Sequence, residues 1–162
     1  MYAVGKIPGG FNKREGKASE HAILTSRVID RPMRPLFPKD YRNDVTLVNM
    51  VMSVDPECNP EIPAMLGSSI ATCISDIPFD GPCATTQVGL INGEYIINPT
   101  MAQKDVSDLQ LTVASTREKV IMIEAGAKEV PEDKMIEAIY KAHEVNQEII
   151  KFIDKIVDCL LY

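Results

Sequence analysis

The sequence predicts a single α+β domain in which helices pack against a sheet. Three observations lead to this fold class. The chain has 162 residues, 45% of them apolar and 25% charged, which suits one globular domain with its own core. Helix signals occur in the first fifth, the middle and the last fifth of the chain. Two hairpin signals lie between the second and third of these helices. The expected order is helix, strand, helix, four strands, helix.

The first quarter of the chain predicts a loop, a helix and an extended segment. Residues 5–17 mix glycine, proline and cations with almost no apolar periodicity, which is typical of an exposed loop. Ser19 is a good N-cap for a helix that ends at Pro32. Residues 30–38 contain three prolines, so we expect this segment to be extended and its arginines to point outward.

The middle of the chain predicts a buried strand followed by a helix. Residues 45–54 carry apolar side chains on both alternating faces, the pattern of an inner strand. Asn59 and Pro60 then provide a cap and a first residue for a helix that continues to Ile74.

The second half predicts two antiparallel hairpins and a long helix. The Asn-Gly pair at 92–93 is the strongest short hairpin signal, and four polar residues at 115–118 separate a second pair of strands. Pro131 opens a helix with an apolar stripe that runs to the end of the chain. The expected strands span residues 84–90, 94–97, 109–114 and 119–124.

Several classes of site and compartment are excluded by the motifs. The four cysteines contain no Cys-x-x-Cys pair, so we expect small buried or half-buried thiols in a reducing compartment. His21 and His143 lack companion ligands and are interpreted as structural or surface residues. Gly10 and Gly16-Lys17 resemble a phosphate-binding Walker loop, but five residues separate the two glycines where the motif has four. Ala18 stands where the motif has a serine or threonine. No membrane span or signal peptide is visible, which predicts a cytoplasmic protein without membrane contact.

Positive charge gathers in the first quarter of an acidic chain. Residues 1–42 hold nine bases and four acids, although the whole chain has a net charge of −6. Such a region can attract a polyanion, with arginine forks on phosphates and Phe11 stacked on a base. The alternatives are a solvated surface, or an ion pair between Asp30 and a neighbouring arginine. The residue types alone leave both alternatives open.

The stretch GKIPGGFNKREGKASEHAILTSRVIDRPMRPLFP closely resembles the first RNase PH-like core of bacterial polynucleotide phosphorylases. The similarity continues through VMSVDPECNPEIPAMLGSSIA, SDIPFDGP, the VGLINGEYIINPT hairpin and the final helix. It therefore covers essentially the whole chain.

The resemblance implies a fold, an activity and partners. The fold is an RNase PH-like core with a mixed sheet and packed helices, truncated on its N-terminal side. Residues 1–150 would form this partial first core, and residues 151–162 would end the last core helix and lead toward an α-helical linker. The implied enzyme is a homotrimeric, magnesium-requiring 3′-to-5′ exoribonuclease. It degrades single-stranded RNA with inorganic phosphate and releases nucleoside diphosphates at its other core.

The resemblance also assigns roles to individual residues. Asn12 and Lys13 depart from the family's second phenylalanine and first arginine, which weakens the expected RNA contact of the loop. The family's catalytic D-x-x-x-x-x-D-x-K positions fall on Lys104, Gln110 and Thr112. These residues lack the carboxylate pair that magnesium requires, so we expect neither a metal site nor a catalytic residue on this chain. The expected RNA-binding residues are Phe11, Lys13, Arg14, Lys17, Arg27, Arg31 and Arg34.

Two other hypotheses remain besides a part of an RNA-degrading enzyme. The chain could act only as an RNA-binding and assembly module, which the missing carboxylate pair favours for the isolated chain. It could also be an unrelated globular domain with a solvated basic face.

Overall fold

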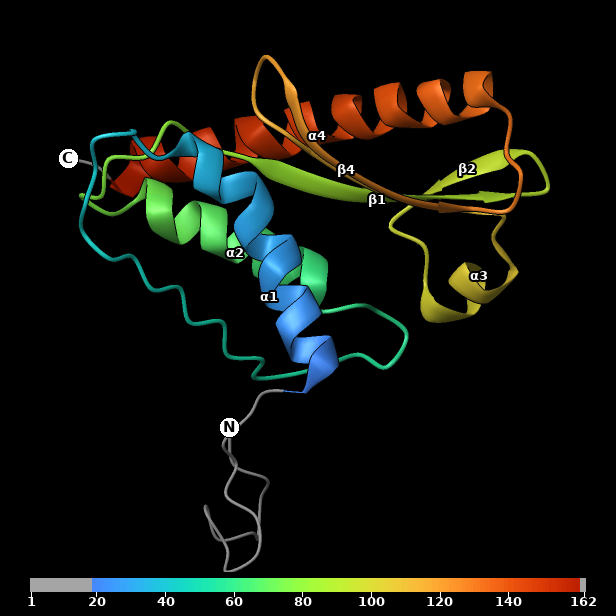
Figure 1. The fold of residues 1–162 in the computed structure, drawn as a ribbon, viewed down its shortest axis with the longest axis horizontal. Helices are drawn as coiled ribbons and strands as arrows, with labels where there is room; N and C mark the ends of the chain where they lie inside the picture. Colours follow the sequence, from blue (N-terminus) through green and yellow to red (C-terminus); the bar gives the residue numbers. More distant parts are fainter. Residues whose placement is uncertain (1–18, 161–162) are drawn as a thin grey trace, which may run out of the picture.

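The computed structural model describes residues 19–160, and it confirms an α+β fold (Figure 1). The strands form one antiparallel sheet in the order β2-β1-β3-β4. Helix α4 packs on one face, and α1 and α2 lie on the other. The elements are α1 (Glu20–Met33), the 3-10 helix η1 (Arg34–Leu36), α2 (Glu61–Cys73), β1 (Ala84–Ile91), β2 (Glu94–Ile97), α3 (Met101–Val106), β3 (Leu109–Ser115), β4 (Val120–Ala127) and α4 (Glu132–Leu160).

Helix α1 begins as expected but continues further than the prolines predict. The Ser19 hydroxyl accepts a hydrogen bond from the backbone N–H of Ala22 at 3.2 Å. The helix includes Pro32 and runs directly into η1, so the expected extended segment at 30–38 is wrong. Burial of Met33 and Leu36, at 2% and 9% exposure, offsets the single helical hydrogen bond that proline removes.

The predicted inner strand at residues 45–54 is also wrong. This segment has no regular secondary structure, and Val48 and Met52 are 76% and 88% exposed. An apolar pattern on both faces shows that a segment is suited to burial, but a strand also needs a neighbour for its backbone groups. Within residues 19–160, no strand pairs with this segment, and the expected mixed sheet is therefore antiparallel throughout.

The two hairpins are confirmed. Asn92 and Gly93 both have positive φ, 51° and 84°, as the two central residues of a tight hairpin turn require. Strands β3 and β4 pair in register, with an irregularity between Ala114 and Ser115. Helix α3 was not predicted, because its six residues are too few for an apolar period to emerge.

Two clusters of buried side chains divide the core between the faces of the sheet. On one face, Val88 and Leu111 pack against Ala138 and Ala142 of α4. On the other face, α1 and α2 pack on only one end of the sheet, around Ala114. The other end of that face is therefore free to form a site. Among residues 19–160, no helix combines the length and hydropathy needed to cross a bilayer.

Candidate functional site

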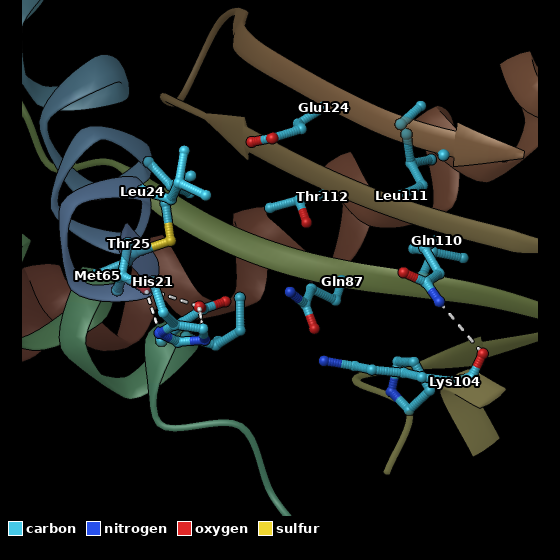
Figure 2. Close-up of a pocket in the computed structure, with 17 residues that line it drawn as sticks. His21, Leu24, Thr25, Met65, Gln87, Lys104, Gln110, Leu111, Thr112 and Glu124 are labelled. Atoms are coloured by element: carbon cyan, nitrogen blue, oxygen red, sulfur yellow. Dashed lines mark hydrogen bonds and ion pairs between the residues drawn. The ribbon is translucent and has the colours of Figure 1, made fainter. Parts of the chain in front are cut away.

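A pocket of about 450 Å³ lies where α1, α2 and α3 surround the uncovered end of the sheet (Figure 2). Its size falls in the range of small-molecule sites, roughly 300 to 1,000 Å³. The helices contribute apolar side chains, among them Leu24 of α1 and Met65 of α2. Both sides also carry polar side chains, among them Glu61 on the helices and Gln87 on the sheet.

The floor of the pocket is a polar row across three strands. Gln87 of β1 pairs with Thr112 of β3, which in turn pairs with Glu124 of β4. Because side chains alternate along a strand, these three lie on the face opposite α4. The next row contains Gln110 and Gly126, and the glycine leaves the floor open beside the glutamine.

Lys104 forms one wall of the pocket, and α3 holds it there. A capping box between Thr100 and Gln103 begins this short helix. Gly89 permits the close approach, because a Cβ at this position would lie 3.1 Å from the Ser107 hydroxyl oxygen and 3.3 Å from Pro99. The Ser107 hydroxyl also accepts the backbone N–H of Leu90 at 2.9 Å, which ties the end of α3 to β1.

The Lys104 side chain lies beside the polar groups of the floor. Figure 2 shows its side chain reaching across the floor toward Gln87. The Gln110 side-chain amide donates to the Lys104 backbone carbonyl at 3.3 Å. None of the ion pairs found within residues 19–160 involves Lys104 or Glu124. Lys104 as a whole residue is half-buried.

The opposite wall carries a network centred on Glu61. The Thr25 hydroxyl donates to its carboxylate at 2.9 Å, and the Asn59 amide donates at 2.8 Å. The His21 ring lies 3.7 Å from the same carboxylate, and its side chain is 83% exposed. These contacts fix α1 to the start of α2 and leave His21 at the pocket mouth, so its expected surface position is confirmed.

Three arginines, two of α1 and one at the start of η1, line a hollow of about 430 Å³ next to the pocket. Arg27, Arg31 and Arg34 share one side of the helix because they are spaced by four and three residues. Arg34 donates from two guanidinium nitrogens to one oxygen of Asp30, at 2.9 and 2.6 Å, so the alternative of an ion pair is correct for this residue. Within the described residues, Arg27 and Arg31 have no ion pair.

The structure thus brings together part of the expected site. Arg27, Arg31 and Arg34 form one row, and Lys104, Gln110 and Thr112 line one pocket. The sequence analysis missed Gln87 and Glu124, whose place depends on the pairing of strands. The other expected RNA-binding residues lie outside residues 19–160. They are Phe11, Lys13, Arg14 and Lys17.

The cysteines follow the expectation only in part. Cys83 is buried, and burial raises the pKa of its thiol to about 11. Cys73 is half-buried, and burial raises its pKa as well. Cys58 and Cys159 are exposed, so the expectation of burial is wrong for these two. Cys58 precedes α2, and Cys159 lies in the last turn of α4.

Comparison with known proteins places this geometry in a family. Residues 1–78 match the family model described as 3′ exoribonuclease family, domain 1, and residues 81–145 match domain 2 of the same family. The chain belongs to the 3′ exoribonuclease family. It is 82% identical over 157 residues to a polyribonucleotide nucleotidyltransferase of Lachnoclostridium phytofermentans, a match that covers 97% of this chain and 22% of that protein.

Another relative agrees with this membership of the 3′ exoribonuclease family, and a solved structure shares the fold. A polyribonucleotide nucleotidyltransferase of Shouchella clausii is 61% identical over 98% of this chain and 22% of its own length. The chain therefore spans about a fifth of the curated relatives it matches. The crystal structure of rice Rrp46 superposes with a TM-score of 0.69 over 88% of this chain and 68% of its own. At 11% identity, that likeness concerns the fold alone.

The pocket of this family member does not fit a magnesium ion. Its lining contains two carboxylates, Glu61 at the start of α2 and Glu124 on the floor formed by the sheet. Glu61 already accepts hydrogen bonds from Thr25 and Asn59, and Lys104 adds a positive charge. Within residues 19–160, no three His, Cys, Asp or Glu side chains lie close enough together to hold a metal. Magnesium prefers carboxylate oxygens and water, and this donor set offers mostly amides and a cation.

Proposed function

We propose that this chain is a non-catalytic, RNA-guiding core of a phosphorolytic 3′-to-5′ exoribonuclease. In the longer protein, a second core would carry magnesium and release nucleoside diphosphates from single-stranded RNA with inorganic phosphate. That protein would be a cytoplasmic homotrimer. The names of the relatives support the activity of the whole, of which this chain spans a fifth.

One observation carries the proposal. Lys104, Gln110 and Thr112 occupy the positions that the resemblance assigns to two catalytic aspartates and a lysine, and all three line one pocket. This supports a pocket at the catalytic position of the fold with a different chemistry. A lysine and a glutamine cannot replace two carboxylates as metal ligands, so the pocket can bind an anion directly but cannot hold magnesium for phosphoryl transfer.

The arginine row provides the route for RNA. Arg27 and Arg31 are exposed and lie in a hollow beside the pocket. Guanidinium groups bind phosphate oxygens with two parallel hydrogen bonds, and several in a row can follow a single strand. We place the core at residues 1–150, followed by residues 151–162 leading toward a helical linker. Helix α4 runs unbroken from Glu132 to Leu160, which supports residues 151–160 as the end of the last core helix.

Salt-dependent RNA binding tests the guiding role. Fluorescence anisotropy of a labelled oligo(A) is measured with the whole chain at several salt concentrations. For R27A/R31A, we expect weaker binding and a salt slope reduced by roughly 0.7 for each phosphate that the variant no longer binds. The control is K151A/K155A, which removes two exposed cations from α4 instead. Equal affinities and slopes for both double variants would refute the route along α1.

A phosphorolysis assay tests the absence of catalysis. The chain is incubated with poly(A), inorganic phosphate and magnesium, and nucleoside diphosphates are measured. We expect no release above a sample without protein. Release that disappears in K104A would show that this pocket is catalytic.

A further inference from the structure

Helix α4 has a second apolar side that the sheet does not cover. The side that packs into the core carries five buried residues, Ala138, Ala142, Asn146, Ile150 and Ile153. Beside it runs a row of mostly apolar residues, here called the outer stripe: Val145, Ile149, Phe152, Ile156 and Cys159. Phe152 is 56% exposed, and Cys159 is exposed as well. Within residues 19–160, the outer stripe therefore stays partly in water.

The spacing of the outer stripe is that of a coiled-coil seam. Its members follow one another at steps of four, three, four and three residues. This seven-residue repeat keeps apolar side chains facing a partner helix over several turns. The stripe occupies the second half of a 29-residue helix, so the partner surface it offers is long and narrow. These features indicate a second helix as the partner.

Charged residues follow the outer stripe on its solvent side. Lys141, Glu148 and Lys155 are seven residues apart, so they form one line beside the stripe, and all three are exposed. On the other side of the stripe lie the buried Asn146 and Ile153, which a partner helix cannot reach. In a parallel pair of α4 helices, the charged line of one copy would meet this buried side of the other. In an antiparallel pair, the two charged lines meet each other, so the charges favour the antiparallel arrangement.

One antiparallel register of two α4 helices satisfies both the packing and the charges. In this register, Ile149 of one copy lies opposite Phe152 of the other, and the remaining apolar positions fall opposite one another as well. The same register brings Glu148 of one copy beside Lys155 of the other. Twofold symmetry makes every contact twice, so two apolar layers and two ion pairs surround the axis.

Glu148 can change its partner at little cost. Its carboxylate now lies 2.8 Å from the ammonium group of Lys151 on the same helix, and the two side chains are 74% and 67% exposed. An exposed ion pair within one helix contributes little to stability. The contact with Lys155 of a second copy can therefore replace it.

We propose that two copies of this chain associate through the outer stripe of α4, as an antiparallel pair of helices with twofold symmetry. The occupant of the stripe is thus a second copy of the chain itself. The inference goes beyond the proposed function, because a twofold contact differs from the threefold ring proposed there. It also leaves the arginine row open, since α1 lies on the opposite face of the sheet from α4 (Figure 1).

Sedimentation equilibrium of the whole chain, from micromolar to millimolar concentration, tests the association. We expect a monomer–dimer equilibrium for the original chain. F152K places a charge in the exposed part of the seam and should abolish the dimer. E148K and K155E each create two like-charge contacts across the axis, and each should weaken the dimer about tenfold. The control is E144K, which makes the same charge change at an exposed site of α4 outside the stripe. Circular dichroism confirms that each variant is folded.

Mixing the two charge variants tests the register. An E148K copy beside a K155E copy regains two opposite-charge contacts, so the mixture should dimerise about as well as the original chain. An effect of either substitution within its own helix would not be relieved by mixing.

Each outcome decides the proposal. A dimer that F152K abolishes, that E148K and K155E weaken, and that mixing restores supports it. A chain that stays monomeric at every concentration overturns it, and so does a dimer that E148K affects no more than E144K. A dimer that survives F152K but is lost in M52K also overturns it, because the contact would then lie on the exposed segment 45–54.

Discussion

Replacement of Asn146 by leucine should destabilise the chain by breaking a buried contact between α4 and the sheet. Asn146 is 0% exposed. Its side-chain oxygen accepts from the Thr86 hydroxyl at 2.7 Å. Its amide donates to the Val113 carbonyl at 3.0 Å and to the Ser115 hydroxyl at 2.8 Å. Leucine has a similar size but makes none of these bonds, so three buried polar groups are left without this partner.

The expected destabilisation follows from these three bonds. A buried hydrogen bond contributes about 1 kcal/mol net, and a buried group left without its partner costs about 1 to 3 kcal/mol. For N146L we therefore expect the free energy of unfolding to fall by about 3 kcal/mol. With a urea m-value of about 2 kcal/mol/M, the unfolding midpoint shifts by about 1.5 M. This is a large fraction of the roughly 5 to 15 kcal/mol that stabilises a typical domain.

Urea unfolding followed by circular dichroism measures the effect on the whole chain. The control is N146L/T86V/S115A, which also removes the two hydroxyl partners. Because apolar groups in place of both partners are nearly neutral, the triple variant should recover most of the stability. The reasoning is refuted if N146L stays within about 0.5 kcal/mol of the original chain, or if the triple variant is less stable than N146L.

Three further results are expected. Desolvation and the hydrogen bond to Glu137 raise the pKa of Tyr95 to about 12 from its usual 10. The stability that this group contributes is therefore complete below pH 10 and is lost as the pH rises toward 12. Between pH 10 and 12, the urea midpoint should fall less for Y95F than for the original chain. Iodoacetamide at pH 8 should label the exposed Cys58 well before Cys83, as mass spectrometry will show, because burial raises the Cys83 pKa to about 11; equal rates would contradict the buried position. M52K should change the free energy of unfolding by less than about 0.5 kcal/mol in urea, because Met52 is 88% exposed, whereas the lysine would cost several times more in an inner strand.

The parts of the fold that sequence predicts are those determined by neighbouring residues. The turn at Asn92 and Gly93 needs positive φ at both residues. Few residue pairs tolerate this, so the two residue types alone predict the turn. The cap at Ser19 likewise acts within three residues. Residues 45–54 are different, because their burial depends on a distant partner strand. Pro32 is tolerated for a similar reason, since distant core contacts of Met33 hold the helix end in place.

In the candidate site too, features set by neighbouring residues could be predicted, and features set by distant residues could not. The spacing of Arg27, Arg31 and Arg34 on one helix is local, and the structure places them in one hollow. The resemblance identified Lys104, Gln110 and Thr112, but residue types alone did not place them together. The row of Gln87, Thr112 and Glu124 depends on the register of three strands, which no short pattern encodes.

Substitutions of polar residues in the pocket should leave the fold intact, because the buried clusters that stabilise it do not include these residues. The cluster around Met33 and Ala114 occupies one end of the sheet face, and the cluster under α4 occupies the opposite face. Lys104 and Gln110 belong to neither, so their replacement by other polar residues removes no buried apolar surface. An acidic pocket attracts phosphate only through a bound cation, whereas a lysine attracts it directly. In the proposed function, the residues at these two positions therefore decide between metal binding and direct anion binding, and neither choice changes the packing of the sheet.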